Sequence, residues 1–238
     1  MAAAKGTLYL IPVALGDGDA ASVLPPATVG AVRSLRTFIV ENAKSARQFL
    51  KAAGYAHPLP QTRLEVLDEH TREDRLEALL APLLAGEDCG LMSEAGCPAV
   101  ADPGAALVRR AHEAGIRVVP LVGPSSVLLA LMACGMNGQR FAFHGYLPVE
   151  ARERARAIRA LETRAADATQ IFIETPYRNT ALFQALLAHC RADTRLCIAA
   201  DLTLPAEFVA TRTIAEWKKK PPDLHRRPAV FLLWRERA

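Results

Sequence analysis

The stretch from Leu91 to Gly104, LMSEAGCPAVADPG, has the composition of a binding loop. It holds two glycines, two prolines, two acidic residues and a cysteine, and it has no side chain that stands out as a nucleophile. Small residues let another molecule approach the backbone closely. Glu94 could meet a ligand ammonium or hydroxyl, although its plainer role is to accept hydrogen bonds from loop amides.

Two other loops share this small-residue character. They span Pro12–Gly18 and Gly123–Ser126, and each follows an apolar stretch that predicts a strand. Ser125 and Ser126 could simply cap the next helix, or their amides and hydroxyls could hold a ligand carboxylate. Because ligands bind beyond the carboxyl ends of parallel strands, the three loops together indicate one ligand site.

The elements that must position these loops alternate between strand and helix. Apolar, β-prone stretches predict strands at residues 7–13, 36–40, 89–92 and 116–122. Helices are predicted from about Pro25, and over residues 45–53, 72–85 and 103–114, with glycines past several ends. This order predicts an α/β fold with an open, mostly parallel sheet and helices on both faces. Asp102 is predicted to be the N-cap of the last of these helices, with Pro103 at its first position.

The second half predicts a different sheet. A charged helix is expected over residues 151–164, and strands over residues 169–174, 195–200, 208–213 and 229–234. No full crossover helix separates the last two strands, which favours a mixed or antiparallel sheet. We therefore expect two α/β domains, an N-terminal one over residues 1–119 and a C-terminal one over residues 120–238.

Composition and missing motifs exclude several classes of protein. With 51% hydrophobic and 23% charged residues, the chain can bury a core and is not expected to be disordered. It has no GxxxxGK[ST], GxGxxG, GxSxG or HExxH motif, and its five cysteines lack metal-ligand spacing, so no metal is expected. There is no apolar run of about 20 residues and no signal-peptide core, so the sequence predicts a cytoplasmic protein without a membrane span.

Basic residues allow, but do not require, a nucleic-acid partner. The net charge is +4, and Arg152, Arg156 and Arg159 share one stripe of the predicted charged helix. A basic tail contains Lys218–Lys220 and Arg226–Arg227. These groups could contact RNA phosphates, whereas the more common role of such charge runs is a solvated surface.

The order of the motifs resembles one known family. LYLIPVALGD, GLMSEAGCPAVADPG, RVVPLVGPSS, FAFHGYLP and IFIETPYR follow one another as in the tetrapyrrole methylases, the class III methyltransferases. Within that family the chain is most similar to the branch that acts on small-subunit ribosomal RNA. The resemblance covers nearly the whole chain. It implies two α/β domains with S-adenosylmethionine in the cleft between them, in a homodimer.

The resemblance also implies a set of cofactor-binding positions. In the first half, Leu10 and Pro12 would flank the cofactor, Glu94 and Cys97 would lie against its methionine end, and Ser125 and Ser126 would hold it through backbone and hydroxyl groups. The adenosine side would be supplied by residues of the second half. These are Ile173, Glu174, Thr175, Leu202, Pro228, Ala229 and Val230.

Departures from the branch concern the acceptor. Where the ribosomal enzymes carry Glu-Asp-Thr-Arg after the second strand, this chain has Glu41-Asn42-Ala43-Lys44. A ribose hydroxyl must lose its proton during methyl transfer, and Glu41, Lys44 and His70 are the candidate catalytic residues by family position, with Glu41 or His70 as base or orienter. The chain also ends soon after its last predicted strand, whereas the ribosomal enzymes continue.

Three functions therefore remain open at the level of sequence. The first is a methyltransferase for the ribose 2′-O of ribosomal RNA, which the basic residues favour. The second is a methyltransferase for a tetrapyrrole or another small molecule. The third is a cofactor-binding relative that has lost its acceptor. The early end of the chain favours the second or the third.

Overall fold

The computed structural model describes residues 4–17, 20–68 and 71–236. The chain forms two compact units, Met1–Ser125 and Ser126–Ala238. From the sequence, the division was expected between residues 119 and 120. In the structure the strand that ends at Pro120 pairs within the first unit, and the loop up to Ser125 stays with it.

The first unit is built on a five-stranded sheet in the order β3-β2-β4-β1-β5. All of its strand pairs are parallel, which confirms the predicted parallel sheet. The edge strand β3 was not predicted, because its four residues alternate charged and apolar side chains over too short a stretch to stand out, and none of them is buried. The strands are β1 (Thr7–Leu10), β2 (Thr37–Val40), β3 (Arg63–Val66), β4 (Cys89–Met92) and β5 (Arg117–Pro120).

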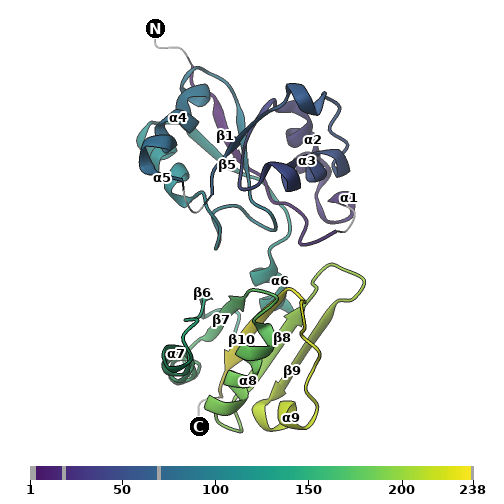
Figure 1. The fold of residues 1–238 in the computed structure, drawn as a ribbon, viewed down its shortest axis with the longest axis vertical. Helices are drawn as coiled ribbons and strands as arrows, with labels where there is room; N and C mark the ends of the chain where they lie inside the picture. The colour runs from purple at the N-terminus through teal and green to yellow at the C-terminus, as the bar shows by residue number, and fades with distance from the viewer. Residues whose placement is uncertain (1–3, 18–19, 69–70, 237–238) are drawn as a thin grey trace. The chain divides into compact units, whose positions relative to one another are not determined.

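Helices cover both faces of this sheet (Figure 1). On one face, Leu79 and Leu107 of α4 and α5 pack with Ile39 and Leu91. On the other face, Leu50 of α3 packs among side chains of β2 and β4, because neighbouring strand residues point to opposite sides. The helical segments of this unit are α1 (Ala20–Val23), α2 (Pro26–Ser34), α3 (Ala43–Ala52), the 3₁₀ turn η1 (Leu59–Gln61), α4 (Glu73–Leu84) and α5 (Ala105–Glu113).

The predicted N-cap of α5 is wrong. The helix begins at Ala105, and its N-cap is Gly104, with φ of +132° and no capping side chain. Glycine tolerates this backbone conformation, so the chain bends there and enters the helix later than expected. The carboxyl of Asp102 bonds instead to the side chain of Ser93, in the loop after β4.

The second unit has a mixed sheet in the order β6-β7-β10-β8-β9, as the strand spacing predicted. Only the β6–β7 pair is parallel; β10 runs antiparallel to β7 and β8, and β9 antiparallel to β8. The strands are β6 (Phe141–Tyr146), β7 (Thr169–Glu174), β8 (Arg195–Ala200), β9 (Phe208–Thr213) and β10 (Ala229–Trp234). The helices are α6 (Ser126–Ala133), α7 (Ala151–Arg164), α8 (Asn179–His189) and α9 (Ile214–Lys219).

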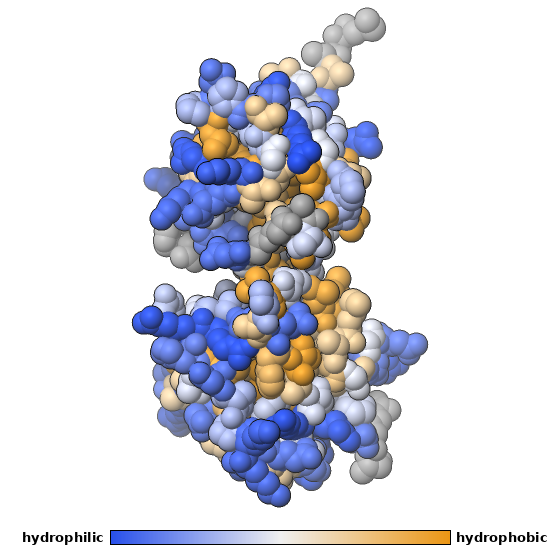
Figure 2. All heavy atoms as spheres, turned by 90° about the vertical axis from the view of Figure 1, so that its right-hand side faces the viewer, coloured by the Kyte–Doolittle hydropathy of each residue, from blue (hydrophilic) through white to orange (hydrophobic). Residues whose placement is uncertain are grey.

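Three helices bury one face of this second sheet. Side chains of α7, α8 and α9 form one core with Phe172 and Phe231, and the Trp217 indole donates a hydrogen bond to the Leu196 carbonyl at 2.8 Å. The apolar helix α6 leads toward the other face, where the carbonyl of Cys134, just after it, accepts a hydrogen bond from Thr211 at 2.7 Å. In Figure 2, apolar residues gather on part of the second unit, between hydrophilic ones.

Candidate functional site

The structure brings the three small-residue loops together at the carboxyl edge of the first sheet. The loops after β1 and β4 form a two-way backbone bridge between Val13 and Gly96, with N to O distances of 2.9 and 3.1 Å. Gly96 has φ of +73°, a conformation that favours glycine. Two loops from neighbouring strands are thereby fixed to each other.

The loop after β5 joins the same edge. The Cys97 thiol donates to the Pro124 carbonyl at 3.5 Å and also bonds to the side chain of Ser125. A methyl group added at Gly123 would lie 2.5 Å from Cβ of Pro12, so only glycine permits this approach. The predicted positions Pro12, Cys97 and Ser125 therefore lie in one set of touching loops.

A cluster of carboxylates lies beside these loops. The amide of Glu94 donates to Oε2 of Glu41 at 3.0 Å, and Ser45 donates to the Glu94 carboxylate at 3.4 Å. Burial raises the pKa of Asp102 to about 6, the Ser93 hydroxyl opposes this rise, and the charges of Glu41 and Glu94 add to it. The negative charge of the edge is thus concentrated in Glu41, Glu94 and Asp102.

Two members of this cluster were predicted from the sequence, and the third was not. Glu41 and Glu94 were candidate site residues, whereas Asp102 was assigned to a helix cap. The available signal was its place in the same small-residue loop as Glu94. A pKa shifted by burial and by neighbouring charges is a common property of functional sites.

A cavity of about 370 Å³ opens next to the cluster. Its lining comes from the loop after β1, from one side of α3 and from Glu94. Ser45 and Phe49 give α3 both a hydroxyl and an aromatic ring at this cavity. The space is large enough for part of a nucleotide-sized ligand.

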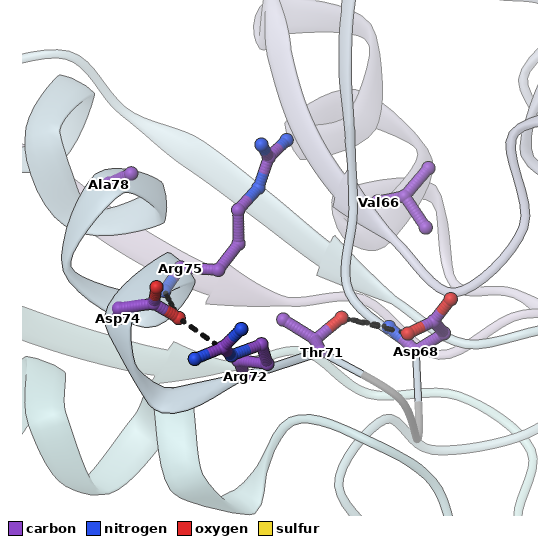
Figure 3. Close-up of a pocket in the computed structure, with 7 residues that line it drawn as sticks. All are labelled: Val66, Asp68, Thr71, Arg72, Asp74, Arg75 and Ala78. Atoms are coloured by element: carbon purple, nitrogen blue, oxygen red, sulfur yellow. Dashed lines mark hydrogen bonds and ion pairs between the residues drawn. The ribbon is translucent and has the colours of Figure 1, made fainter.

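A second, larger cavity of about 570 Å³ lies at the end of β3 (Figure 3). In its lining, Arg72 pairs with Asp74 at 3.8 Å, and Thr71 donates to Asp68 at 2.8 Å. Arg75 pairs with Glu65 at 3.3 Å. Because β2 and β3 are neighbours, this charged groove shares an edge with Glu41.

The two other catalytic candidates, Lys44 and His70, have no described contact with the carboxylate cluster that contains Glu41. Lys44 lies exposed in the first turn of α3, where its amide donates to the capping Asn42 side chain at 2.8 Å. His70 lies outside the described residues. Glu41 is thus the one candidate of the three whose side chain has a described hydrogen bond within the carboxylate cluster.

Leu10 and Pro12 hold the first loop in place. The Leu10 carbonyl, at the end of β1, accepts a hydrogen bond from the Leu121 amide at 2.9 Å. Pro12 is buried against the position of Gly123. Ser126 begins α6 and belongs to the second unit.

The remaining predicted cofactor residues gather at one end of the second sheet. Ile173 pairs with Val230, and Glu174 pairs with Ala229, across β7 and β10. The Pro228 carbonyl accepts a hydrogen bond from the Asp201 amide at 3.0 Å. Sequence positions 173–175, 202 and 228–230 are therefore neighbours in space, although about 50 residues separate the first group from the last.

Glu174 is the most buried charged side chain of this end. Its Oε1 accepts from the Thr175 amide at 2.7 Å and from Arg178 at 2.6 and 2.9 Å. Its Oε2 and the Oδ1 of the fully buried Asn179 have no hydrogen-bond partner within the described part of the chain. Buried acceptors of this kind are normally satisfied by a donor from water or a ligand.

The site has little capacity for thiolate chemistry. Burial raises the pKa of Cys97, although its bond to Ser125 opposes that rise, so the thiol stays protonated near neutral pH. Within residues 4–17, 20–68 and 71–236, no cluster of three or more His, Cys, Asp or Glu side chains is arranged to hold a metal ion. None of the helices in these ranges is long and apolar enough to cross a membrane.

Known proteins match the chain along nearly its whole length. The sequence pattern of the family described as Tetrapyrrole (Corrin/Porphyrin) Methylases matches residues 7–218. A protein named ribosomal RNA small subunit methyltransferase I from Escherichia coli O157:H7 is 31% identical over 232 residues, covering 96% of this chain and 77% of its own.

A second relative and a solved structure extend the comparison. The protein of the same name from Neisseria meningitidis serogroup B is 34% identical over 214 residues, covering 89% of this chain and 69% of its own. The crystal structure of a diphthine synthase matches with a TM-score of 0.68 at 17% identity, covering 96% of this chain and 89% of that one. This likeness shows that the two chains share a fold.

Proposed function

The chain belongs to the tetrapyrrole (corrin/porphyrin) methylase family, and we propose that it is an S-adenosylmethionine-dependent methyltransferase that acts on RNA of the small ribosomal subunit. The observation that carries the proposal is the meeting of three small-residue loops beside Glu41, Glu94 and Asp102. The relatives from Escherichia coli and Neisseria meningitidis are both named as methyltransferases of small-subunit ribosomal RNA, and these names support the choice of RNA.

The residues present fit a ligand with the charges of this cofactor. S-adenosylmethionine carries a sulfonium and an ammonium, and carboxylates are the groups that stabilise cations in a partly buried site. The glycines at 96 and 123 let the loops pack closely against one another, and the cavity beside Glu94 would accommodate the methionine half. Ser125 and Ser126 would contribute amides and hydroxyls to its carboxylate.

The adenosine half is assigned to the second unit on family resemblance. Ile173–Thr175, Leu202 and Pro228–Val230 would contact it through backbone groups and apolar surface. The unpartnered oxygens of Glu174 and Asn179 support a donor-bearing ligand at this end of the sheet. This assignment stays a prediction, which cofactor binding by a Glu174→Gln variant can test.

The chain's own residues would orient the acceptor and hold its proton. The bound cofactor supplies an electrophilic methyl group, which is transferred by in-line displacement. Positioning of the two reactants contributes most of the acceleration. For a ribose hydroxyl, Glu41 or His70 would accept or orient the proton, and the hydrogen bond from the Glu94 amide fixes the Glu41 carboxylate.

The first experiment measures thermal unfolding with and without S-adenosylmethionine. A ligand at 100 times its Kd stabilises the folded state by about 2.7 kcal/mol. For a chain of this size, each kcal/mol raises Tm by about 2–4 °C. No rise at millimolar cofactor, with or without added RNA, would reject the proposed cofactor.

The second experiment follows transfer of a labelled methyl group to small ribosomal subunits or to their naked RNA. Glu41→Gln and His70→Ala are compared with Glu77→Gln, which changes an exposed acid on α4. A loss of about 10²–10⁴-fold in kcat is expected for the residue that acts as base. If both variants keep wild-type turnover, neither residue has that role.

A tetrapyrrole or other small molecule is the second candidate acceptor, and the description of the family favours it. Labelled methyl appearing on an added tetrapyrrole, and not on RNA, would select it. Cofactor binding without transfer to either class would select a non-catalytic relative.

We also propose that the chain forms a homodimer. Leu128 and Met132 lie four residues apart on α6 and are 52% and 80% exposed. An apolar pair of this kind on a helix is typical of an interaction surface. Sedimentation equilibrium measures the mass directly, and a monomer at micromolar concentration would contradict this part.

A further inference from the structure

Tyr177 is an exposed aromatic side chain at the end of the second sheet where the predicted cofactor residues gather. Its side chain is 77% exposed, and it lies between β7 and α8. Most large apolar surface is buried on folding, so a ring in this position is available to a partner. A flat exposed ring can stack on another flat group.

Arg226 lies against this ring. Its guanidinium carbon is 5.7 Å from the ring centroid of Tyr177, within the range of a cation–π contact. Its backbone has φ of +56°, which is unfavourable for a residue with a Cβ. The adjacent Arg227 is fixed by Asp201 at 2.5 Å and by the Ala206 carbonyl at 2.6 Å. This anchoring holds the strained turn that presents Arg226.

Arg178 adds a second cation beside Tyr177 in the sequence. Buried Glu174 binds its Nε and Nη2, at 2.9 and 2.6 Å, while the side chain remains 36% exposed. The pair fixes the guanidinium plane and leaves Nη1 outside this contact. A held arginine loses little conformational entropy when it binds a phosphate.

We propose that Tyr177, Arg226 and Arg178 form a contact site for single-stranded RNA. In it one base stacks on the Tyr177 ring, and the two guanidinium groups bind neighbouring phosphates. Sequence-tolerant binding of single strands combines these two features, aromatic stacking and positive charge. The inference rests on the proposed function, because it gives the proposed RNA substrate a binding site on the second unit.

The test measures the Kd of the full-length protein for a fluorescein-labelled oligouridylate of about ten nucleotides by fluorescence anisotropy. Tyr177→Ala is expected to raise Kd about 5- to 150-fold, the range of one base–aromatic stack. Tyr177→Phe keeps the ring and should stay within about twofold of wild type. Arg226→Gln should lower the slope of log Kd against log salt by about 0.7, the value of one phosphate contact.

Matched variants control for general effects. Phe141→Ala removes another exposed ring, 44% exposed, at the start of β6 and thus at the opposite end of the sheet. Arg191→Gln removes an exposed arginine that pairs with Asp193 at 3.1 Å before β8. Both should bind the oligouridylate as wild type does. Heparin has charge without bases, and its binding should not change in Tyr177→Ala.

The outcomes separate this inference from the proposed function. Unchanged RNA affinity in Tyr177→Ala, with wild type still methylating ribosomal RNA, overturns the contact site alone. An equal loss of heparin and RNA binding, or a loss of the thermal shift by S-adenosylmethionine, also overturns it, because the ring would then have another role. If wild type binds no RNA and methylates none, both the inference and the RNA substrate fail.

Discussion

At the scale of single residues, the most informative group is Asp102. Burial raises its pKa to about 6 from an ordinary value of 3.8. The folded state therefore binds the proton more tightly, and the free energy of unfolding falls as pH rises from about 4 to about 6. Asp102→Asn removes this dependence. The quantity to compare is the unfolding free energy of the variant minus that of wild type. We expect this difference to be about 1–2 kcal/mol larger at pH 7.5 than at pH 4, a value that allows for solvent access.

Urea unfolding of both proteins at several pH values measures this difference. Asp74→Asn is the control, because Asp74 is exposed in the first turn of α4 and its ion pair with Arg72 is loose. The control should not alter the change in stability between pH 4 and pH 6. Parallel wild-type and Asp102→Asn curves over that window would show that Asp102 is not the group responsible.

At the scale of elements, the close approach of two loops depends on Gly123. An added Cβ would lie 2.5 Å from Cβ of Pro12 and 3.0 Å from Leu24. The proline ring cannot move aside, so Gly123→Ala should destabilise the fold by about 1–3 kcal/mol and weaken the thermal shift by S-adenosylmethionine. Gly30→Ala, in the middle of α2 with nothing within 4 Å, should instead stabilise by about 0.4–1 kcal/mol.

Chemical unfolding of the two glycine variants distinguishes a steric cause from a general effect of alanine. Equal changes in both would contradict a steric cause, because only Gly123 lacks space for the new methyl group.

The short helix α9 depends on its first residues. Thr213 caps it, with the Glu216 side chain bonded back to the Thr213 amide at 2.8 Å. This cap positions Ile214 and Trp217, both fully buried. Thr213→Ala should cost about 1 kcal/mol of unfolding free energy, measured in urea. Thr163→Ala, late in α7 on an exposed side, should change it by less than about 0.5 kcal/mol, and an equal loss would argue against capping.

At the scale of the whole molecule, electrostatics should govern RNA binding. Arg152, Arg156 and Arg159 are exposed on α7, and only Arg156 has an ion pair, with Glu153 at 3.5 Å, among the described residues. Changing all three to Gln should lower the salt slope of RNA binding by about 1–2, since each phosphate contact contributes about 0.7. Arg109 and Arg110 on α5, which pair with Glu113, provide a double control. An unchanged slope would identify the α7 stripe as a solvated surface.

The sequence by itself determined most of the elements. Short continuous apolar runs placed β2 and β4, helical periodicity placed α3 and α4, and Gly54 and Gly86 marked two helix ends, where each has a positive φ. These features are local, because hydrophobic spacing and backbone preference act over a few neighbouring residues. The same pattern predicted a parallel sheet followed by a mixed one.

Only the tertiary structure decided which side chains meet. It placed Asp102 with Ser93, Glu41 and Glu94 rather than at a helix cap, and it set Arg226 against the exposed ring of Tyr177. Glu41 and Glu94 are 53 positions apart in the chain and contact only because β2 and β4 are neighbours in the sheet. Strand order, burial and the resulting pKa shifts arise from the packing of distant segments, which no local pattern encodes.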